Sequence, residues 1–291
     1  MGNLALTYYA LGRYDAAQEL QEQEYEAKKW VLGPEHPETL RAMGNLAATY
    51  SAVGRHTIAL DLQDQVYEAL KRVLGPEHPD TLRAMGNLAL SYSALCFQDE
   101  ALELQEQEYE ARKRVSGPEH PDTLRAMGNL AATYSDLGRH AEALELQEQV
   151  YEASKRVLGS EHPHTLTAMN NLAAIYSNMD RHAEALDLLE QVYEASKRAL
   201  GPEHPHTLTA MGNLAVTYSN MGRHAEALEL QEQVYEARKR VLGPEHPHTL
   251  MAIGNLASTY SNLGKYTEAL ELRKQIHEAR NRMPGPDHPE S

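Results

Sequence analysis

The chain has 291 residues, with 27 lysines and arginines against 42 aspartates and glutamates, a net charge of −15. This balance argues against a nucleic-acid binder, which needs a basic surface to displace counterions, and against docking on an anionic membrane. No apolar run approaches the roughly 18 residues of a spanning helix, and no signal-peptide pattern opens the chain. The single cysteine, Cys96, permits neither an internal disulfide nor a cysteine zinc cluster, so we expect a soluble, cytoplasmic protein.

A five-residue motif divides the chain at a constant interval of 42 residues. It reads GPEHP, with one serine and one aspartate variant, at Gly33–Pro37, Gly75–Pro79, Gly117–Pro121, Gly159–Pro163, Gly201–Pro205, Gly243–Pro247 and Gly285–Pro289. A strict period is typical of one elongated array rather than of two globular domains. We predict a single array over 1–291, made of a truncated first repeat, six full repeats and the start of an eighth: 1–32, 33–74, 75–116, 117–158, 159–200, 201–242, 243–284 and 285–291.

Each repeat carries two apolar stripes at helical spacing. In the 117–158 repeat they are Leu124, Met127, Leu130, Ala131 and Tyr134, then Ala143, Leu146, Val150, Ala153 and Val157. Pro121 suits the first position of a helix, and Gly138 suits a left-handed helix end. We predict an all-α fold with helices of about 17 and 19 residues. Neither helix can bury its stripe alone, so the repeats must stack.

Two turns and both ends depart from this pattern. Cys96, Phe97 and Gln98 replace the usual Gly-Arg-His between the helices of the 75–116 repeat, and Asp180 stands where a glycine is expected, so both turns are in doubt. The first helix lacks its opening turn, and the chain stops as an eighth repeat begins. We therefore expect a piece of a longer array, in which both ends expose an apolar helix face.

The repeated residues resemble the tetratricopeptide repeat (TPR). Its N-L-G/A, Tyr, Gly and E-A positions are matched by Asn129-Leu130-Ala131, Tyr134, Gly138 and Glu142-Ala143. The long period and the LGPEHPDT linker are similar to those of kinesin light chains and of the sensor arrays of fungal NLR-like NTPases, and the near-identity of neighbouring copies is closer to the latter. The resemblance implies a right-handed α-solenoid of seven antiparallel helix pairs, whose first helices line a concave groove. It also implies a protein-interaction scaffold within a larger signalling or adaptor protein.

The residues favour binding over catalysis. No G-x-S-x-G, H-E-x-x-H or P-loop motif occurs, so we predict neither an enzyme nor a cofactor. The linker histidines fit helix-start chemistry, because too few converge on one point to hold a metal. Adventitious metal binding at the HPH sequences is the alternative: His162, His164, His204, His206, His246 and His248.

The groove positions that the family implies give the candidate site. One position carries arginine in three repeats, which would bind ligand carboxylates through bidentate hydrogen bonds: Arg41, Arg83 and Arg125. Another carries asparagine, whose amide both donates and accepts and could hold an extended peptide backbone: Asn45, Asn87, Asn129, Asn171, Asn213 and Asn255. The remaining candidates are Ser135, Asn178, Asn220 and Asn262.

Three alternatives remain open from the sequence. The glycines that precede the asparagines could admit a ligand or allow tight packing against a neighbouring repeat: Gly44, Gly86, Gly128, Gly212 and Gly254. The arginine position changes to Thr167, Thr209 and Met251, which could reflect ligand recognition or neutral drift. The array could bind a peptide or protein, or it could associate with itself through its ends.

Overall fold

The structure is a computed structural model that describes residues 2–10 and 13–282, and it divides into two compact units, Met1–Arg139 and His140–Ser291. The first unit holds α1 (Gly2–Ala10), α2 (Tyr14–Leu32), α3 (Pro37–Ala52), α4 (His56–Leu74), α5 (Pro79–Ala94), α6 (Gln98–Ser116) and α7 (Pro121–Asp136). The second holds α8 (His140–Leu158), α9 (Pro163–Asn178), α10 (His182–Leu200), α11 (Pro205–Asn220), α12 (His224–Leu242), α13 (Pro247–Asn262) and α14 (Tyr266–Arg282). We call the odd-numbered helices first helices and the even-numbered ones second helices.

The linker motif starts each complete first helix. Pro37 occupies the first helical position of α3, and the N-cap residue His36 accepts a hydrogen bond at its Nδ1 from the backbone N–H of Glu38 at 3.2 Å. The same cap recurs at His78, His120, His162, His204 and His246. The linker glutamate Glu35 pairs with Arg72 at the end of α4. Helix-start chemistry therefore explains the linker histidines.

Left-handed residues end the helices. Gly75 has φ 92° and donates its N–H to the Lys71 carbonyl at 3.1 Å, which closes α4. The two doubtful turns keep their geometry, because Cys96 (φ 62°) and Asp180 (φ 59°) adopt the left-handed conformation that glycine takes elsewhere. A non-glycine residue pays about 1 kcal/mol for that conformation.

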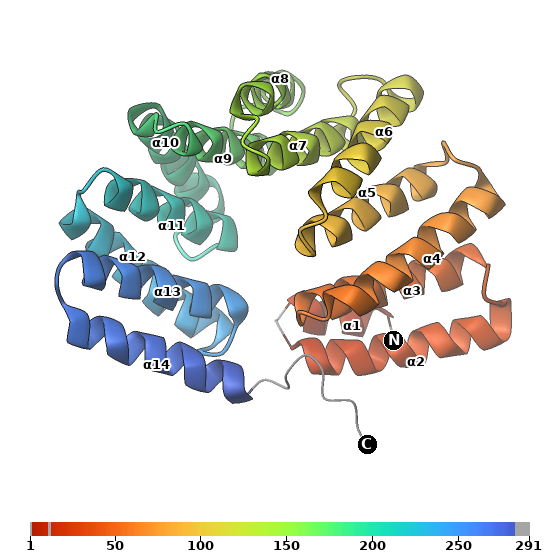
Figure 1. The fold of residues 1–291 in the computed structure, drawn as a ribbon, viewed down its shortest axis with the longest axis horizontal. Helices are drawn as coiled ribbons and strands as arrows, with labels where there is room; N and C mark the ends of the chain where they lie inside the picture. The colour runs from red at the N-terminus through yellow and green to blue at the C-terminus, as the bar shows by residue number, and fades with distance from the viewer. Residues whose placement is uncertain (1, 11–12, 283–291) are drawn as a thin grey trace. The chain divides into compact units, whose positions relative to one another are not determined.

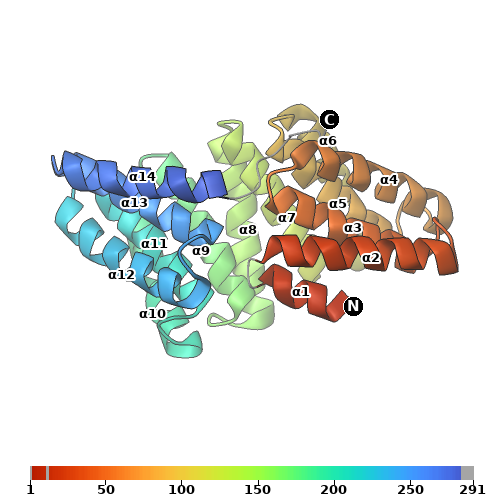
Figure 2. The same ribbon diagram turned by 90° about the horizontal axis from the view of Figure 1, so that it is seen from below.

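Each helix packs on its neighbours in chain order within its unit. Figures 1 and 2 both show α1 beside α2 and α13 beside α14. Leucine, methionine and alanine side chains fill the core, and one cluster joins two consecutive repeats through Leu40, Met43, Val66, Leu82 and Met85. The predicted all-α array of stacked helix pairs is confirmed, with first helices of 16 residues and second helices of 19 in the complete repeats.

The tyrosines of the first stripe join consecutive repeats. The apolar stripe predicts them to be buried, yet they are half-buried. Five of the phenols donate a hydrogen bond to a glutamate on the second helix of the preceding repeat: Tyr50, Tyr134, Tyr176, Tyr218 and Tyr260. Tyr50 donates to Glu22 at 2.7 Å, and Tyr260 donates to Glu232 at 2.8 Å. Burial and then this hydrogen bond raise the pKa of Tyr50 to about 12. The hydrogen bond and then burial raise the pKa of Tyr260 to about 12.

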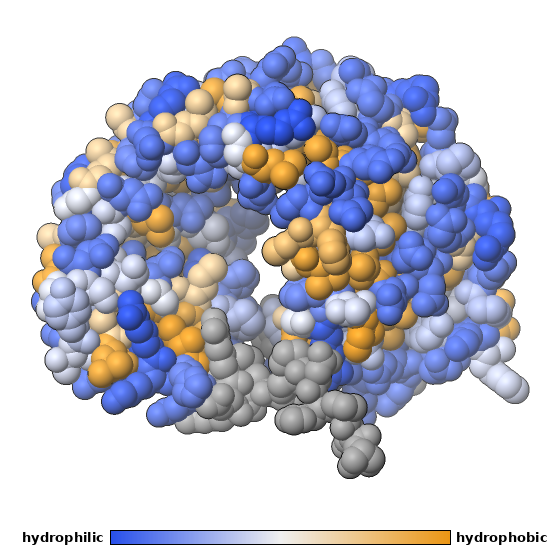
Figure 3. Space-filling view, in the orientation of Figure 1, coloured by the Kyte–Doolittle hydropathy of each residue, from blue (hydrophilic) through white to orange (hydrophobic). Residues whose placement is uncertain are grey.

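The visible surface of each unit is mostly hydrophilic, with apolar side chains in scattered groups (Figure 3). Among the described residues, no helix combines the length and apolarity needed to cross a membrane. The predicted start of an eighth repeat, 285–291, lies outside the described residues.

Candidate functional site

The three predicted groove arginines are exposed, and each pairs with an acid one turn earlier in its own helix. Arg41 Nη2 lies 2.5 Å from Glu38 Oε2, and Arg83 Nη2 lies 2.7 Å from Asp80 Oδ1. The acid occupies the first turn, where the helix dipole favours a negative charge. A ligand carboxylate would therefore compete with an internal carboxylate for each arginine.

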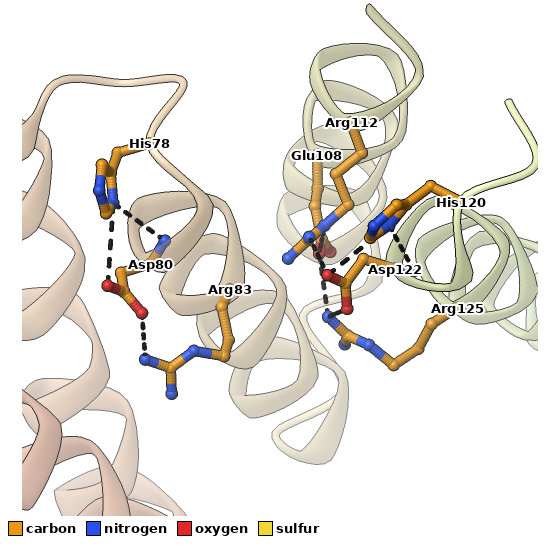
Figure 4. A network of polar contacts seen from close by, with 8 residues as sticks. All are labelled: His78, Asp80, Arg83, Glu108, Arg112, His120, Asp122 and Arg125. Atoms are coloured by element: carbon orange, nitrogen blue, oxygen red, sulfur yellow. Dashed lines mark hydrogen bonds and ion pairs between the residues drawn. The ribbon is translucent and has the colours of Figure 1, made fainter. Parts of the chain in front are cut away.

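Arg125 belongs to a larger network around the start of α7 (Figure 4). Its Nη2 lies 3.7 Å from Asp122 Oδ1 and 3.8 Å from Glu108 Oε1 on α6. Glu108 accepts a hydrogen bond from Arg112 Nε at 2.6 Å, and the two side chains are only 0% and 3% exposed. Arg112 also lies 3.6 Å from Asp122. We call Glu108, Arg112, Asp122 and Arg125 the α6–α7 charge cluster.

The sequence analysis did not identify the α6–α7 charge cluster. A signal was present, because Glu108 stands where four other repeats have valine: Val66, Val150, Val192 and Val234. Burial raises the pKa of Glu108, although the Arg112 and Arg125 guanidinium groups oppose that shift. The first repeat has a similar arrangement, in which Lys28 lies 2.7 Å from Glu24 and 3.4 Å from Glu38.

The glycines beside the asparagines have different surroundings in different repeats. A Cβ on Gly86 would lie 2.3 Å from Glu108 Oε2, so a side chain of the same repeat fills that space. A Cβ on Gly44 or Gly212 would meet no atom within 4 Å, and one on Gly254 would lie 3.9 Å from Ile276. Tight packing therefore accounts for Gly86, whereas Gly44 and Gly212 leave open space.

The predicted asparagines are accessible to different degrees. Asn171 is exposed, whereas the others in its series are half-buried: Asn45, Asn87, Asn129, Asn213 and Asn255. Asn213 on α11 donates from Nδ2 to Asn170 Oδ1 on α9 at 2.9 Å, which links consecutive first helices. The asparagines that end the first helices are exposed: Asn178, Asn220 and Asn262.

Ser135 does not suit the groove position that the resemblance implied. It is only 8% exposed. Equivalent serines face the second helix of their own repeat, where Ser93 Oγ donates to Gln98 Oε1 at 3.5 Å and Ser51 Oγ lies 3.5 Å from His56 Nδ1. A serine here helps to join the two helices, so its recurrence reflects structure.

The first helices of the second unit replace the first-turn acid with histidine. His164, His206 and His248 stack on the capping histidines, with ring centroids 5.3 to 5.5 Å apart. The Nδ1 atoms of the capping histidines are already engaged by backbone N–H groups. Among the described residues, no group of three or more His, Cys, Asp or Glu could hold a metal ion.

Burial lowers the pKa of three of these imidazoles: His206, His246 and His248. Neighbouring charges act in the same direction. His204 and His164 lower the pKa of His206, and Arg238 lowers those of His246 and His248. The second unit therefore has imidazoles in the first turns of its first helices where the first unit has carboxylates.

Comparison with known proteins finds a repeat family that matches along most of the chain. The sequence profile of the tetratricopeptide repeat family matches residues 1–71, 45–113, 98–156, 129–198, 164–240 and 207–282. The crystal structure of nearly identical TPR-like repeats from a Podospora anserina protein assigned as a kinesin light chain is 36% identical, with a TM-score of 0.56. The match covers 71% of this chain and 98% of that one.

More distant structures share the fold. RapI without ligand is 13% identical, with a TM-score of 0.67 and coverage of 96% of both chains. NprR in complex with its cognate peptide NprX is 17% identical, with a TM-score of 0.64, covering 93% of this chain and 78% of that one. At these identities the likeness shows the fold alone. Among curated proteins, none matches this chain.

Proposed function

The chain belongs to the tetratricopeptide repeat family, and from that premise we propose that it is a scaffold that binds an extended peptide or partner protein along its first helices. The observation that carries the proposal is the open space beside Gly44 and Gly212, next to the amides of Asn45 and Asn213. A glycine inside a helix costs about 1 kcal/mol relative to alanine, and here packing does not require it. This arrangement supports the binding of a ligand whose backbone comes close to the first helices.

The exposed first-helix residues supply chemistry for an extended ligand. Asparagine amides can donate to and accept from a peptide backbone. In the first unit Arg41 and Arg83 can exchange their internal acids for ligand carboxylates. A structural neighbour, NprR, has been solved with a peptide, which supports a peptide as the class of ligand.

A peptide-display selection followed by titration tests this proposal. The best binder is titrated against the wild type, against R41A/R83A, and against E38Q/D80N, which frees both arginines. We expect weaker binding to the first variant and tighter binding to the second, because the internal acids compete for the guanidinium groups. Equal affinity for all three proteins would remove the arginines from the site. Unchanged binding by an N45A/N87A/N213A variant would remove the asparagines.

We also propose that the array is the recognition part of a larger cytoplasmic protein, either an NLR-like signalling protein or an adaptor. The near-identity of neighbouring repeats supports the first alternative. The full reading frame distinguishes them, because a nucleotide-binding domain before the array would indicate a sensor and a coiled coil would indicate an adaptor.

Self-association is a second candidate function. Leu270 on α14 is 53% exposed, whereas its equivalents Leu60 and Leu228 are half-buried beneath the following repeat. An apolar helix face of this kind favours contact with another copy. Light scattering over a concentration series tests it. A mass that rises with concentration for the wild type but not for L270E supports self-association, and a constant monomer mass rejects it.

A further inference from the structure

Arg238 on α12 is a buried cation without a carboxylate partner among the residues that the structure describes. The residue is 6% exposed, and its Nη1 donates a hydrogen bond to the His248 carbonyl at 3.0 Å. Among the described residues, that carbonyl is its hydrogen-bond acceptor and no acid lies within ion-pair distance. Burying a charge without a counter-charge is costly, so the position favours an anion.

The chain itself shows what a basic residue at this repeat position binds. Arg112 contacts two carboxylates, Glu108 on its own helix and Asp122 in the first turn of the next helix. Lys28 contacts the equivalent pair, which is Glu24 and Glu38. Both carboxylates are missing around Arg238, because Val234 replaces the first and His248 replaces the second. The repeat thus retains the cation of this arrangement, Arg238, but neither of the two carboxylates.

Space for a carboxylate remains beside Arg238. Glu108 holds its carboxylate over Gly86, 2.3 to 2.8 Å from where a Cβ would lie. The equivalent glycine is Gly212, and no atom lies within 4 Å of its Cβ position. In the 75–116 repeat, Arg112 Nε donates to the carboxylate that lies over Gly86. By repeat equivalence, the place for a carboxylate that binds Arg238 is the space over Gly212.

We propose that Arg238 and the open space over Gly212 form a binding site for a carboxylate group. The group would take the position that Glu108 occupies in the 75–116 repeat and would accept charge-assisted hydrogen bonds from the guanidinium. If the array binds peptides, as proposed above, the group is an acidic side chain or the C-terminal carboxylate of the peptide. Only that last assignment rests on the proposed function.

Glutarate, a small dicarboxylate, is the probe for this site. It is titrated into the full chain while the Nε–H resonance of Arg238 is followed by NMR, and the resonance is assigned from its loss in R238S. Serine at this position is already tolerated, because Ser154 and Ser196 occupy it in other repeats. We expect a saturable shift of this resonance. In R238S, glutarate should protect against thermal unfolding at least about tenfold less effectively.

The V234E variant provides the matched test, because it restores the internal carboxylate of the α6–α7 charge cluster. We expect the Arg238 resonance to move without ligand and glutarate to lose its effect. A wild-type response that persists unchanged in V234E or R238S would overturn the proposal, as would no response in the wild type. An equal response to inorganic phosphate would overturn the carboxylate assignment.

Peptide binding and carboxylate binding can fail separately. If peptides bind equally well to the wild type and to R238S, and glutarate does not bind, the scaffold function is supported and the carboxylate site is rejected. If glutarate binds but the display selection yields no peptide, the carboxylate site is supported and the scaffold function is not.

Discussion

The first turns of α7 and α13 have the same backbone but opposite chemistry. Their N-cap residues His120 and His246 have nearly identical dihedral angles, φ −65° with ψ 139° and 138°. Around α7 lies the α6–α7 charge cluster, with its buried Glu108–Arg112 pair. Around α13 the equivalent positions hold neutral side chains beside the single buried cation, Arg238.

This difference shows that the repeat does not need the charge cluster to fold. Capping, proline placement and the buried leucines are shared by both turns, as Leu124 and Leu250 illustrate. The charged positions therefore vary on a constant framework. Differences between copies of the repeat are more informative about function than the residues that all copies share.

Replacing Arg112 near α7 and Arg238 near α13 should give the largest difference between the two regions in the free energy of unfolding. R112S leaves Glu108 buried without its closest counter-charge, and we expect a loss of about 3–5 kcal/mol in the free energy of unfolding. R238S removes an unpaired cation, so we expect little loss or a gain. Urea unfolding of both variants measures the contrast, and equal destabilisation would contradict it.

The double variant E108V/R112S is the control, because it reproduces the Val150 and Ser154 of another repeat. It should recover most of the stability lost in R112S. The pH dependence gives a further check. Since the folded-state pKa of Glu108 is raised, its protonated form favours the folded state. The defect of R112S should therefore deepen as the pH rises through that pKa.

Alanine in place of the two equivalent glycines should have effects of opposite sign. In G86A the new Cβ meets the Glu108 carboxylate, and we expect overpacking to cost about 1–3 kcal/mol. In G212A the Cβ enters open space, and we expect a gain of about 0.5–1 kcal/mol from the better helix propensity of alanine. Thermal unfolding measures both. Loss of stability in G212A would show that the space is not open in solution.

The turns that precede α6 and α12 offer a smaller test. Cys96 and Gly222 occupy equivalent left-handed positions, with φ 62° and 75°. C96G should stabilise the protein by about 1 kcal/mol by removing the strain of a side chain at positive φ, and G222A should destabilise it by about the same amount. If C96G lowers the unfolding temperature, the cysteine side chain must contribute contacts that outweigh the strain.

The framework could be predicted from the sequence, because it depends on local rules repeated in every copy. Among the described residues, a proline begins each complete first helix and a glycine at positive φ follows every second helix from α2 to α12. The charge cluster could not be predicted. Glu108 and Arg112 stand at positions that vary between repeats, and their burial depends on how α6 packs against its neighbours, which periodicity alone does not reveal. The burial of Ser135 could not be predicted for a similar reason, since the family position that it matches does not show how its side chain packs.

Acidification should weaken the start of α13, because His246 and His248 are held neutral there. Burial and Arg238 lower their folded pKa values below the unfolded value of about 6.5. The unfolded state therefore binds protons more readily, so this stability is fully present above the unfolded value and is lost as the pH falls below it through the folded pKa values. Amide exchange between pH 7.5 and 5.5, corrected for the intrinsic rate, should show falling protection in the first turn of α13. H248D should lose less protection, since its carboxylate can pair with Arg238 and favours the helix start. Protection that holds as the pH falls, or an equal loss in H248D, would mean that these imidazoles do not govern the stability of this turn.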